Sequence, residues 1–239
     1  MDRARLFQRL GVEPSIHKRL RSVIRKGLKD ARGRPPTGVI VLDAGCGRKS
    51  PLVRFRPEIA RLVGVDVHTP EPPLPWLDAF AVVDLCEHGA PSPDGHAFDL
   101  ILSNFTLEHF ADPQAALDNF SAWLTPGGTL VVTTVNRRHP FVAAYLGIPD
   151  LLRRRLQPLL KESAADAHPL VGACNDPTAV AAALRRAGLQ KVRVETVPNL
   201  ARAWGRRRWS FAAGLVGDLL TQSIPSRRST ILAVARRPE

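Results

Sequence analysis

The stretch that most constrains the fold is residues 39–47, Val-Ile-Val-Leu-Asp-Ala-Gly-Cys-Gly. Its apolar residues lead into Asp43, and glycines follow at positions 45 and 47. A short apolar run bounded by glycines is typical of a strand that is buried on both faces of a sheet. The glycines permit a sharp turn and let the backbone approach a ligand closely. The stretch therefore predicts the strand and turn that open a nucleotide-type pocket.

Further short apolar runs follow along the chain. They cover residues 62–66, 80–84, 98–104, 129–135, 192–197 and 230–235. Helical segments separate several of them, and Asp112-Pro113 and Asp176-Pro177 are typical capped helix starts. Alternating strands and helices predict a doubly wound, mainly parallel α/β sheet, which binds ligands beyond the carboxyl ends of its strands.

Polar residues stand at the carboxyl ends of the first four predicted strands. They are Gly45 and Gly47, then Asp66, then Asp84, then Ser103 and Asn104. Asp66 lies about 20 residues beyond the glycine turn, the spacing at which a carboxylate meets ribose hydroxyls in dinucleotide-binding folds. Because a carboxylate repels phosphate, an acid here favours an unphosphorylated ribose.

Length and composition limit the class of protein. The 239 residues, 44% hydrophobic, suit one α/β domain with elaborations. The sequence contains no run of about 18 apolar residues that would predict a membrane span. The first residues lack the apolar core of a signal peptide, and the three cysteines have no metal-ligand spacing. We therefore expect a reduced, cytoplasmic protein without a metal centre.

The net charge of +12 is unevenly distributed. Residues 1–34 carry 11 basic and 3 acidic side chains, residues 35–135 carry 5 and 12, and residues 136–239 carry 18 and 7. Basic flanks around an acidic centre favour an anionic surface or substrate met by the flanks. Alternatively, the arginines are solvated side chains that only add solubility.

The basic flanks suggest three elaborations of the domain. Residues 1–34 form a predicted basic helical segment before a domain at 35–239, and its amphipathic helix at 15–30 either lies on an anionic membrane or packs over the domain. Residues 136–175 combine arginines with apolar residues, and residues 198–229 combine arginines with apolar and tryptophan residues. We expect them to be lid or acceptor-binding insertions, or helices that cover the sheet edge. Lids of this composition suit an anionic, lipid-like acceptor or peripheral contact with an anionic membrane.

Taken together, these stretches resemble the class I S-adenosylmethionine-dependent methyltransferases, specifically the methyltransferase type 11 group. The matching stretches are VLDAGCG at 41–47, LVGVD at 62–66, AVVDL at 81–85, FDLILSNFTLEHF at 98–110 and LTPGGTLVVTT at 124–134. The resemblance implies a Rossmann-like, seven-stranded sheet with a reversed last strand and helical insertions. It also implies S-adenosyl-L-methionine as the cofactor.

The resemblance assigns cofactor contacts residue by residue. The residues are Asp43, Gly45, Cys46, Gly47, Asp66, Val67, Asp84, Leu85, Ser103 and Asn104. Asp43 to Gly47 would bind the amino-acid end of the cofactor, and Asp66 and Val67 would bind the ribose and the adenine. Asp84 and Leu85 would contact the adenine edge, and Ser103 and Asn104 would contact the methionine moiety. One departure is Lys49, which stands where many members have a third glycine. It predicts an unusual loop and following helix, in which Arg48 or Lys49 could reach the cofactor carboxylate.

Three histidines are candidates for contact with the acceptor. His109 is the predicted general base, because the family pattern often has a histidine there and a hydroxyl acceptor must lose a proton. The alternative is that His109 caps a turn or packs structurally. His139 and His168 lie in the 136–175 insertion and could face the acceptor.

The expected function is therefore methyl transfer to a small-molecule acceptor, at an oxygen nucleophile. An alternative is a nucleic-acid methyltransferase that uses the basic flanks. Against it, Ser-Asn-Phe-Thr at 103–106 differs from the Asn/Asp-Pro-Pro-Tyr/Phe stretch of many base-amino methyltransferases. A further alternative is a non-catalytic cofactor-binding partner.

Overall fold

A single seven-stranded sheet runs through the computed structural model, which describes residues 6, 7, 9, 10, 12, 16–32, 38–160, 171 and 174–239. The strand order across the sheet is β3-β2-β1-β4-β5-β7-β6. The strands are β1 (Ile40–Ala44), β2 (Arg61–Asp66), β3 (Ala79–Val82), β4 (Phe98–Asn104), β5 (Leu124–Val135), β6 (Gln190–Val197) and β7 (Thr230–Arg236).

Strand directions confirm the predicted fold. The neighbours from β3 to β5 are all paired in parallel, whereas β7 is antiparallel to both β5 and β6. The reversed strand is the last in the chain, as expected. The carboxyl ends of β1 and β4 lie side by side in the middle of the sheet, where the strand order reverses, so the polar residues that end them belong to one edge.

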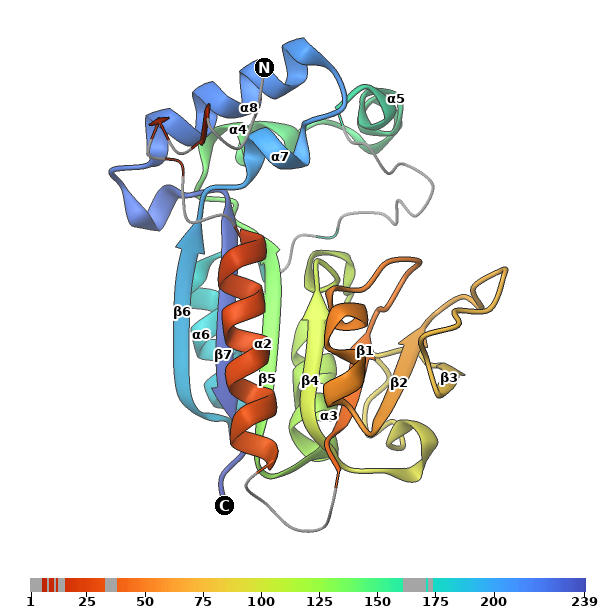
Figure 1. Cartoon of the computed structure of the whole chain (residues 1–239). Helices are drawn as coiled ribbons and strands as arrows, with labels where there is room; N and C mark the ends of the chain where they lie inside the picture. The colour runs from red at the N-terminus through yellow and green to blue at the C-terminus, as the bar shows by residue number, and fades with distance from the viewer. Residues whose placement is uncertain are drawn as a thin grey trace.

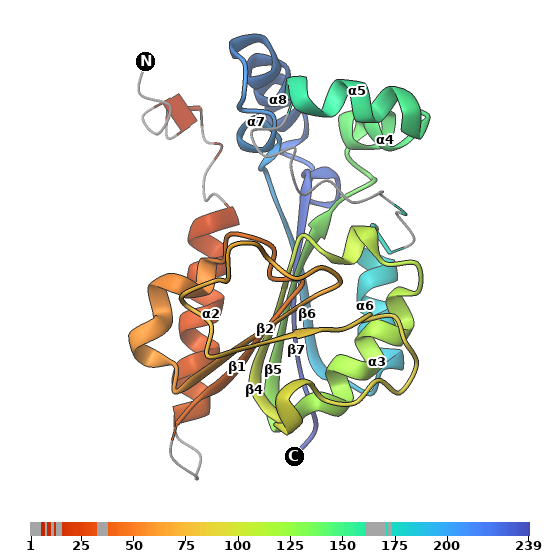
Figure 2. The same ribbon diagram turned by 90° about the vertical axis from the view of Figure 1, so that its right-hand side faces the viewer.

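Helices cover both faces of the sheet (Figure 2). One face carries α2 (Ile16–Arg32) and the 3-10 helix η1 (Pro51–Glu58), and the other carries α3 (Pro113–Trp123) and α6 (Pro177–Arg186). Short 3-10 turns lie at η2 (Pro93–Gly95), η3 (Leu107–His109) and η4 (Pro225–Arg227). Two apolar layers therefore enclose the strands, as their near-continuous hydrophobic sequences predict.

Local sequence signals set the helix starts. Asp112 accepts hydrogen bonds from the N–H groups of Gln114 and Ala115, the second and third residues of α3, both at 3.0 Å, and Asp176 caps α6 in the same way. Each acid precedes a proline at the first helical position, as predicted. Ser50 caps η1, which has Pro57 inside it. The expected unusual helix after the glycine turn is thus a 3-10 helix.

Helix α2 buries its apolar side. Ile16, Leu20, Ile24 and Leu28 are at most 3% exposed and belong to one apolar layer with β1 and β4. Gly27 lets the helix approach β4 closely, because a Cβ there would lie 2.6 Å from a Leu100 methyl carbon. The helix was predicted either to lie on an anionic membrane or to pack over the domain. The structure shows that its apolar side packs over the domain. The predicted boundary at residue 34 falls within 33–37, outside the described residues.

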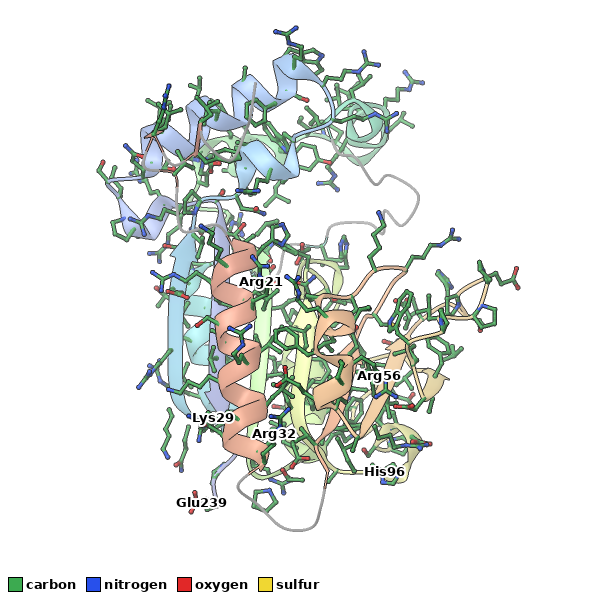
Figure 3. All side chains as sticks on the ribbon, in the orientation of Figure 1. Arg21, Lys29, Arg32, Arg56, His96 and Glu239 are labelled. Atoms are coloured by element: carbon green, nitrogen blue, oxygen red, sulfur yellow. The ribbon has the colours of Figure 1, made fainter. Side chains whose placement is uncertain are left out.

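The basic side of α2 faces outward. Figure 3 shows Arg21, Lys29 and Arg32 along the outer side of this helix. Arg32 donates to Glu58 of η1 at 2.8 Å, and Asp30 accepts from Arg236 of β7. These pairs tie α2 to the elements on either side of it.

Both predicted insertions form helices beyond the carboxyl ends of β5 and β6 (Figure 1). Residues 136–175 contain α4 (Pro140–Leu146) and α5 (Asp150–Leu160), and residues 198–229 contain α7 (Leu200–Ala203) and α8 (Arg208–Thr221). We call these four helices the helical cap. None of the helices that the structure describes is long and apolar enough to cross a bilayer.

The packing of α2 predicts a large effect of truncating its buried side chains. We expect Leu20→Ala or Ile24→Ala to lower the free energy of unfolding by about 2–5 kcal/mol, because each leaves a cavity in the core. The exposed Arg25→Ala is the matched control on the same helix and should change it by less than about 0.5 kcal/mol. Denaturant titration measures the free energy of unfolding of each variant. Equal denaturation midpoints for the core variants and Arg25→Ala would contradict this role for α2.

Candidate functional site

The turn after β1 folds over the end of β2. The N–H groups of Gly45 and Cys46 both donate to the Val65 carbonyl, at 2.8 and 3.1 Å. Gly45 has φ +72°, and a Cβ there would lie 2.3 Å from Thr106 Cγ2, so this position requires glycine. Gly47 has φ +50°, with no atom within 4 Å of where its Cβ would lie. The turn is thus packed against Thr106 at Gly45, whereas the space beside Gly47 is open.

Asp66 fastens this turn to the end of β2. Its Oδ2 accepts a hydrogen bond from the Gly47 N–H at 3.0 Å, and its Oδ1 accepts one from the Val67 N–H at 2.8 Å. A carboxylate has about four acceptor positions, so both oxygens can still receive hydroxyl protons. Asp66 is half-buried and Val67 is exposed. The carboxylate therefore combines a fixed orientation with access from the surface.

Asp43 is a buried acid with spare hydrogen-bonding capacity. Its side chain is 2% exposed, and its Oδ2 has no hydrogen-bond partner among the described residues. Burial raises the pKa of Asp43 to about 7, against a hydrogen bond from Ser50 that lowers it. Asp66 raises it further by charge repulsion. A cationic or N–H-bearing ligand group would satisfy this oxygen.

The residues after β3 form a turn. Asp84 is exposed, and its Oδ1 accepts from the Cys86 N–H at 2.9 Å. Leu85 places its side chain in the core, and its carbonyl accepts from Asn119 of α3 at 3.1 Å. Cys46 likewise packs its thiol close to Gly64 of β2, 3.1 Å from where a Cβ would lie. Leu85 and Cys46 can therefore offer a ligand only their backbone.

The end of β4 offers two polar side chains on opposite faces of the sheet. Asp43 pairs with Leu102, so Asn104 shares the face of Asp43 and Ser103 points to the other face. The Asn104 Oδ1 accepts from the Thr133 hydroxyl at 2.8 Å. The Ser103 hydroxyl is buried and has no partner among the described residues. The structure therefore brings Asp43 and Asn104 together, with Ser103 behind them.

An unusual backbone conformation follows β4. Phe105 has φ 56°, in the left-handed region that a bulky residue rarely adopts. Its N–H is held by the Thr133 carbonyl and hydroxyl, both at 3.0 Å. The bend places the Thr106 hydroxyl 3.3 Å from the Ala44 carbonyl. Strained positions of this kind cluster at functional sites, and this one connects the ends of β1, β4 and β5.

The three candidate histidines have different surroundings. His109 lies in η3, directly after β4, and is partly exposed. His139 is completely buried, and its Nδ1 accepts from two N–H groups at the start of α4, at 3.2 and 3.4 Å. Burial lowers its pKa. His139 is thus a helix cap, and its contact with an acceptor stays a prediction. His168 lies outside the described residues.

A buried polar cluster that the sequence did not predict lies beside His109. Glu108 is 3% exposed, and its Oε2 accepts from the Thr134 hydroxyl of β5 at 2.8 Å. The same hydroxyl lies 3.2 Å from the Asn175 Oδ1. The Glu108 carbonyl accepts from the Val171 N–H at 2.9 Å. The only local signal was an acid next to the histidine, because its partners are distant in sequence.

The residues at this edge fit S-adenosylmethionine. Its ammonium or N–H groups suit the unpartnered Asp43 oxygen, its ribose hydroxyls suit Asp66, and the space beside Gly47 lets the cofactor approach the backbone. The sulfonium is a cation, and three acids lie nearby: Asp43 near the end of β1, Asp66 at the end of β2, and Asp84 in the turn after β3.

The raised pKa of Asp43 predicts a dependence of stability on pH. Folding raises this pKa from 3.8 to about 7, so the protonated acid is the form favoured in the folded protein. The resulting stabilisation is complete below pH 3.8 and is lost as the pH rises through 7. Relative to Asp43→Asn, we expect the wild type to lose up to about 4 kcal/mol of unfolding free energy over this range.

Denaturant titrations of both proteins at a series of pH values measure this difference. Asp118→Asn, at an exposed acid of α3, is the control and should keep the wild-type pH dependence. If the unfolding free energies of the wild type and Asp43→Asn changed in parallel with pH, this would contradict the raised pKa of Asp43.

Comparison with known proteins adds independent findings. Residues 16–194 match the methyltransferase domain family. An uncharacterized methyltransferase of Mycobacterium tuberculosis is 33% identical over 104 residues, which are 39% of this chain and 49% of that protein. A ubiquinone biosynthesis O-methyltransferase of Cereibacter sphaeroides is 31% identical over 128 residues, 50% of this chain and 51% of that protein. The chain thus spans about half the length of these curated relatives.

The fold is also similar to that of solved proteins. The methyltransferase in complex with the Haloferax volcanii Trm112 methyltransferase activator superposes with a TM-score of 0.56, over 93% of each chain and at 18% identity. At this identity the likeness concerns the fold alone. The family match covers most of the chain and agrees with the strand order and the glycine turn. The chain therefore belongs to the methyltransferase domain family, with the fold of class I S-adenosylmethionine-dependent methyltransferases.

Proposed function

We propose that this protein transfers a methyl group from S-adenosylmethionine to a hydroxyl oxygen of a small-molecule acceptor. The observation that carries the proposal is the sheet edge where the open Gly47 backbone, the oriented Asp66 carboxylate and the unpartnered Asp43 oxygen converge. Structural acids normally have their hydrogen bonds satisfied. A buried carboxylate oxygen left over at a strand end supports a role in binding.

The cofactor would lie across the carboxyl ends of β1 to β4. Asp66 would accept the ribose hydroxyls, and the backbone after Asp84 would meet the adenine edge. Asp43 and Asn104, on one face of the sheet, would hold the amino-acid end. When bound, the cofactor supplies a methyl group that its positive sulfur has already activated for displacement. The chain then has to fix the acceptor oxygen in line with that methyl group and exclude water.

His109 is the proposed proton acceptor. It is partly exposed on η3, directly after β4, and so lies at the same edge as Asn104. Its imidazole would take the proton that the acceptor hydroxyl loses as the new oxygen–carbon bond forms. Glu108 supports it as a positioning residue, because its buried carboxylate ties η3 to Thr134 of β5.

A small-molecule acceptor has two sources of support. The Cereibacter sphaeroides relative is a ubiquinone biosynthesis O-methyltransferase, which favours an oxygen acceptor of modest size. In addition, the helical cap stands beyond the strand ends and combines aromatic residues with arginines. Phe141 and Tyr145 both pack against Trp204 there, with ring centroids 6.4 and 6.2 Å from the Trp204 ring. Such a cap suits an acceptor that has both an apolar and an anionic part.

Cofactor binding is predicted to depend on the Asp66 carboxylate. Asp66→Asn should weaken binding of S-adenosylhomocysteine by about 10- to 100-fold, because a hydrogen bond to a charged group contributes roughly 1.5–3 kcal/mol. Calorimetry measures the affinity. The control Asp118→Asn removes the same charge from the exposed side of α3 and should bind as the wild type does. Equal affinities for all three proteins would refute the assignment of Asp66.

Methyl transfer itself is tested with isotopically labelled cofactor and panels of phenolic and catechol acceptors. We expect labelled O-methyl products, and a kcat for His109→Ala that is about 10²–10⁴-fold lower with unchanged cofactor affinity. His96→Ala, on the loop before β4, is the matched control and should leave kcat unchanged. Transfer to RNA alone would favour the nucleic-acid alternative. Cofactor binding without any transfer would favour the non-catalytic one.

A further inference from the structure

The 14-residue helix α8 of the helical cap has three distinct sides. Its inner side carries small or buried polar residues and packs against α7 and α4. A Cβ at Gly214 would lie 2.7 Å from the Leu200 carbonyl, and one at Gly217 would lie 3.0 Å from the His139 ring. A second side packs against the N-terminal segment, where the Phe211 and Phe7 ring centroids are 5.8 Å apart. Two sides of α8 are therefore covered.

The third side of α8 is apolar, and none of the residues that the structure describes covers it. Trp209, Val216 and Leu220 are 53%, 50% and 63% exposed. Spacings of seven and four residues place them on one stripe of the helix, along with the exposed Ala212. Ile224, just beyond the helix, is 41% exposed. An amphipathic helix normally buries its apolar side, and a contiguous exposed stripe is typical of an interaction site.

Arginines stand at both ends of the stripe. Arg206, Arg207 and Arg208 precede or begin α8 and are exposed, as is Arg227 after its end. Residues 198–229 contain one acid, Asp218, which is 1% exposed. Its carboxylate accepts from the backbone N–H groups of Leu200 and Ala201, at 3.1 and 2.9 Å. The surface of this segment therefore combines an apolar stripe with positive charge and no exposed carboxylate.

The other half of the helical cap has a similar composition. On α5, Leu151, Leu152 and Leu159 are 72%, 52% and 36% exposed, and Arg155 is exposed among them. Residues 136–160 and 198–229 together contain eleven arginines and two aspartates. In Figure 1 these helices form one layer at the end of the molecule, beyond the strand ends.

The composition distinguishes between possible partners. A second copy of the chain would bring one arginine-rich cap against another, and this repulsion opposes association. Nucleic acid would use the arginines but leave Val216 and Leu220 in water. An anionic bilayer satisfies both features, because the stripe enters the acyl boundary while the arginines meet lipid phosphates. Helix α8 is about 21 Å long, which suits a helix lying in the interface and not one crossing it.

We propose that the outer side of α8 docks this protein on an anionic lipid membrane. This docking surface consists of Trp209, Val216 and Leu220 with Arg206, Arg207, Arg208 and Arg227. Docking places the helical cap, and with it the strand ends, at the membrane surface. The proposal goes beyond methyl transfer and does not depend on it. It also replaces α2 as the membrane-binding element, since the apolar side of α2 is buried in the core.

Vesicle flotation of the full chain tests the proposal. We expect binding to phosphatidylcholine vesicles that contain about one third phosphatidylglycerol, and little binding to pure phosphatidylcholine, because the arginines need anionic headgroups. The triple variant Trp209→Ser, Val216→Ser, Leu220→Ser should lose at least about tenfold in partitioning, and so should Arg206→Gln, Arg207→Gln, Arg208→Gln.

Two matched controls isolate the surface. Val53→Ser with Val82→Ser removes apolar side chains that are 41% and 59% exposed elsewhere, and Arg25→Gln with Arg54→Gln removes exposed charges on α2 and η1. Both control proteins should float as the wild type does. Unchanged melting temperature and cofactor affinity in every variant show that folding is intact.

Three results would overturn the proposal. These are equal flotation of the α8 variants and the wild type, equal binding to neutral and anionic vesicles, and no binding to either. Sedimentation velocity adds a fourth: a dimer of the wild type that the apolar α8 variant abolishes would assign the stripe to a second copy of the chain.

Discussion

The hydrogen bonds between the turn after β1 and the end of β2 are the constraint on which the candidate site depends. The Val65 carbonyl accepts hydrogen bonds from two N–H groups of the turn, and the Asp66 carboxylate accepts a third from the Gly47 N–H. These bonds fix the backbone that would meet the cofactor before any ligand arrives. They also bring Asp66 within electrostatic range of Asp43, which contributes to the raised pKa of that acid. One set of hydrogen bonds thus orders the loop and also holds Asp66 where it contributes to the raised pKa of Asp43.

The sequence predicted this edge well because its signals are local. Each strand was visible as a short apolar run, and parallel strands in a doubly wound sheet must end at a common edge. The polar residue after each run could therefore be placed at this edge without knowledge of contacts, and its contact with a cofactor stays a prediction. The left-handed Phe105 and the bonds from Glu108 to Thr134 could not be found this way. They depend on the arrangement of β4 beside β5, which no local pattern encodes.

Helices α2 and α8 show a second limit of sequence patterns. Both are amphipathic or apolar segments beside arginines, and both suggested contact with a membrane. The apolar side of α2 is completely buried at Ile16, Ile24 and Leu28, whereas Trp209, Val216 and Leu220 of α8 are at least 50% exposed. Periodicity predicts that a helix has an apolar side, but only the neighbouring elements decide whether that side is covered. Here the sheet covers α2, and α8 retains an open stripe at the end of the molecule.

The most direct test of the account is a crystal structure of the protein with S-adenosylhomocysteine. We expect electron density for the ligand across the carboxyl ends of β1 to β4, with ribose hydroxyls on Asp66 and the amino-acid end beside Asp43 and Asn104. The turn at 45–47 should keep its hydrogen bonds to Val65, because this backbone is already ordered. Density at another face of the sheet, or a ribose that contacts neither oxygen of Asp66, would contradict the proposed site.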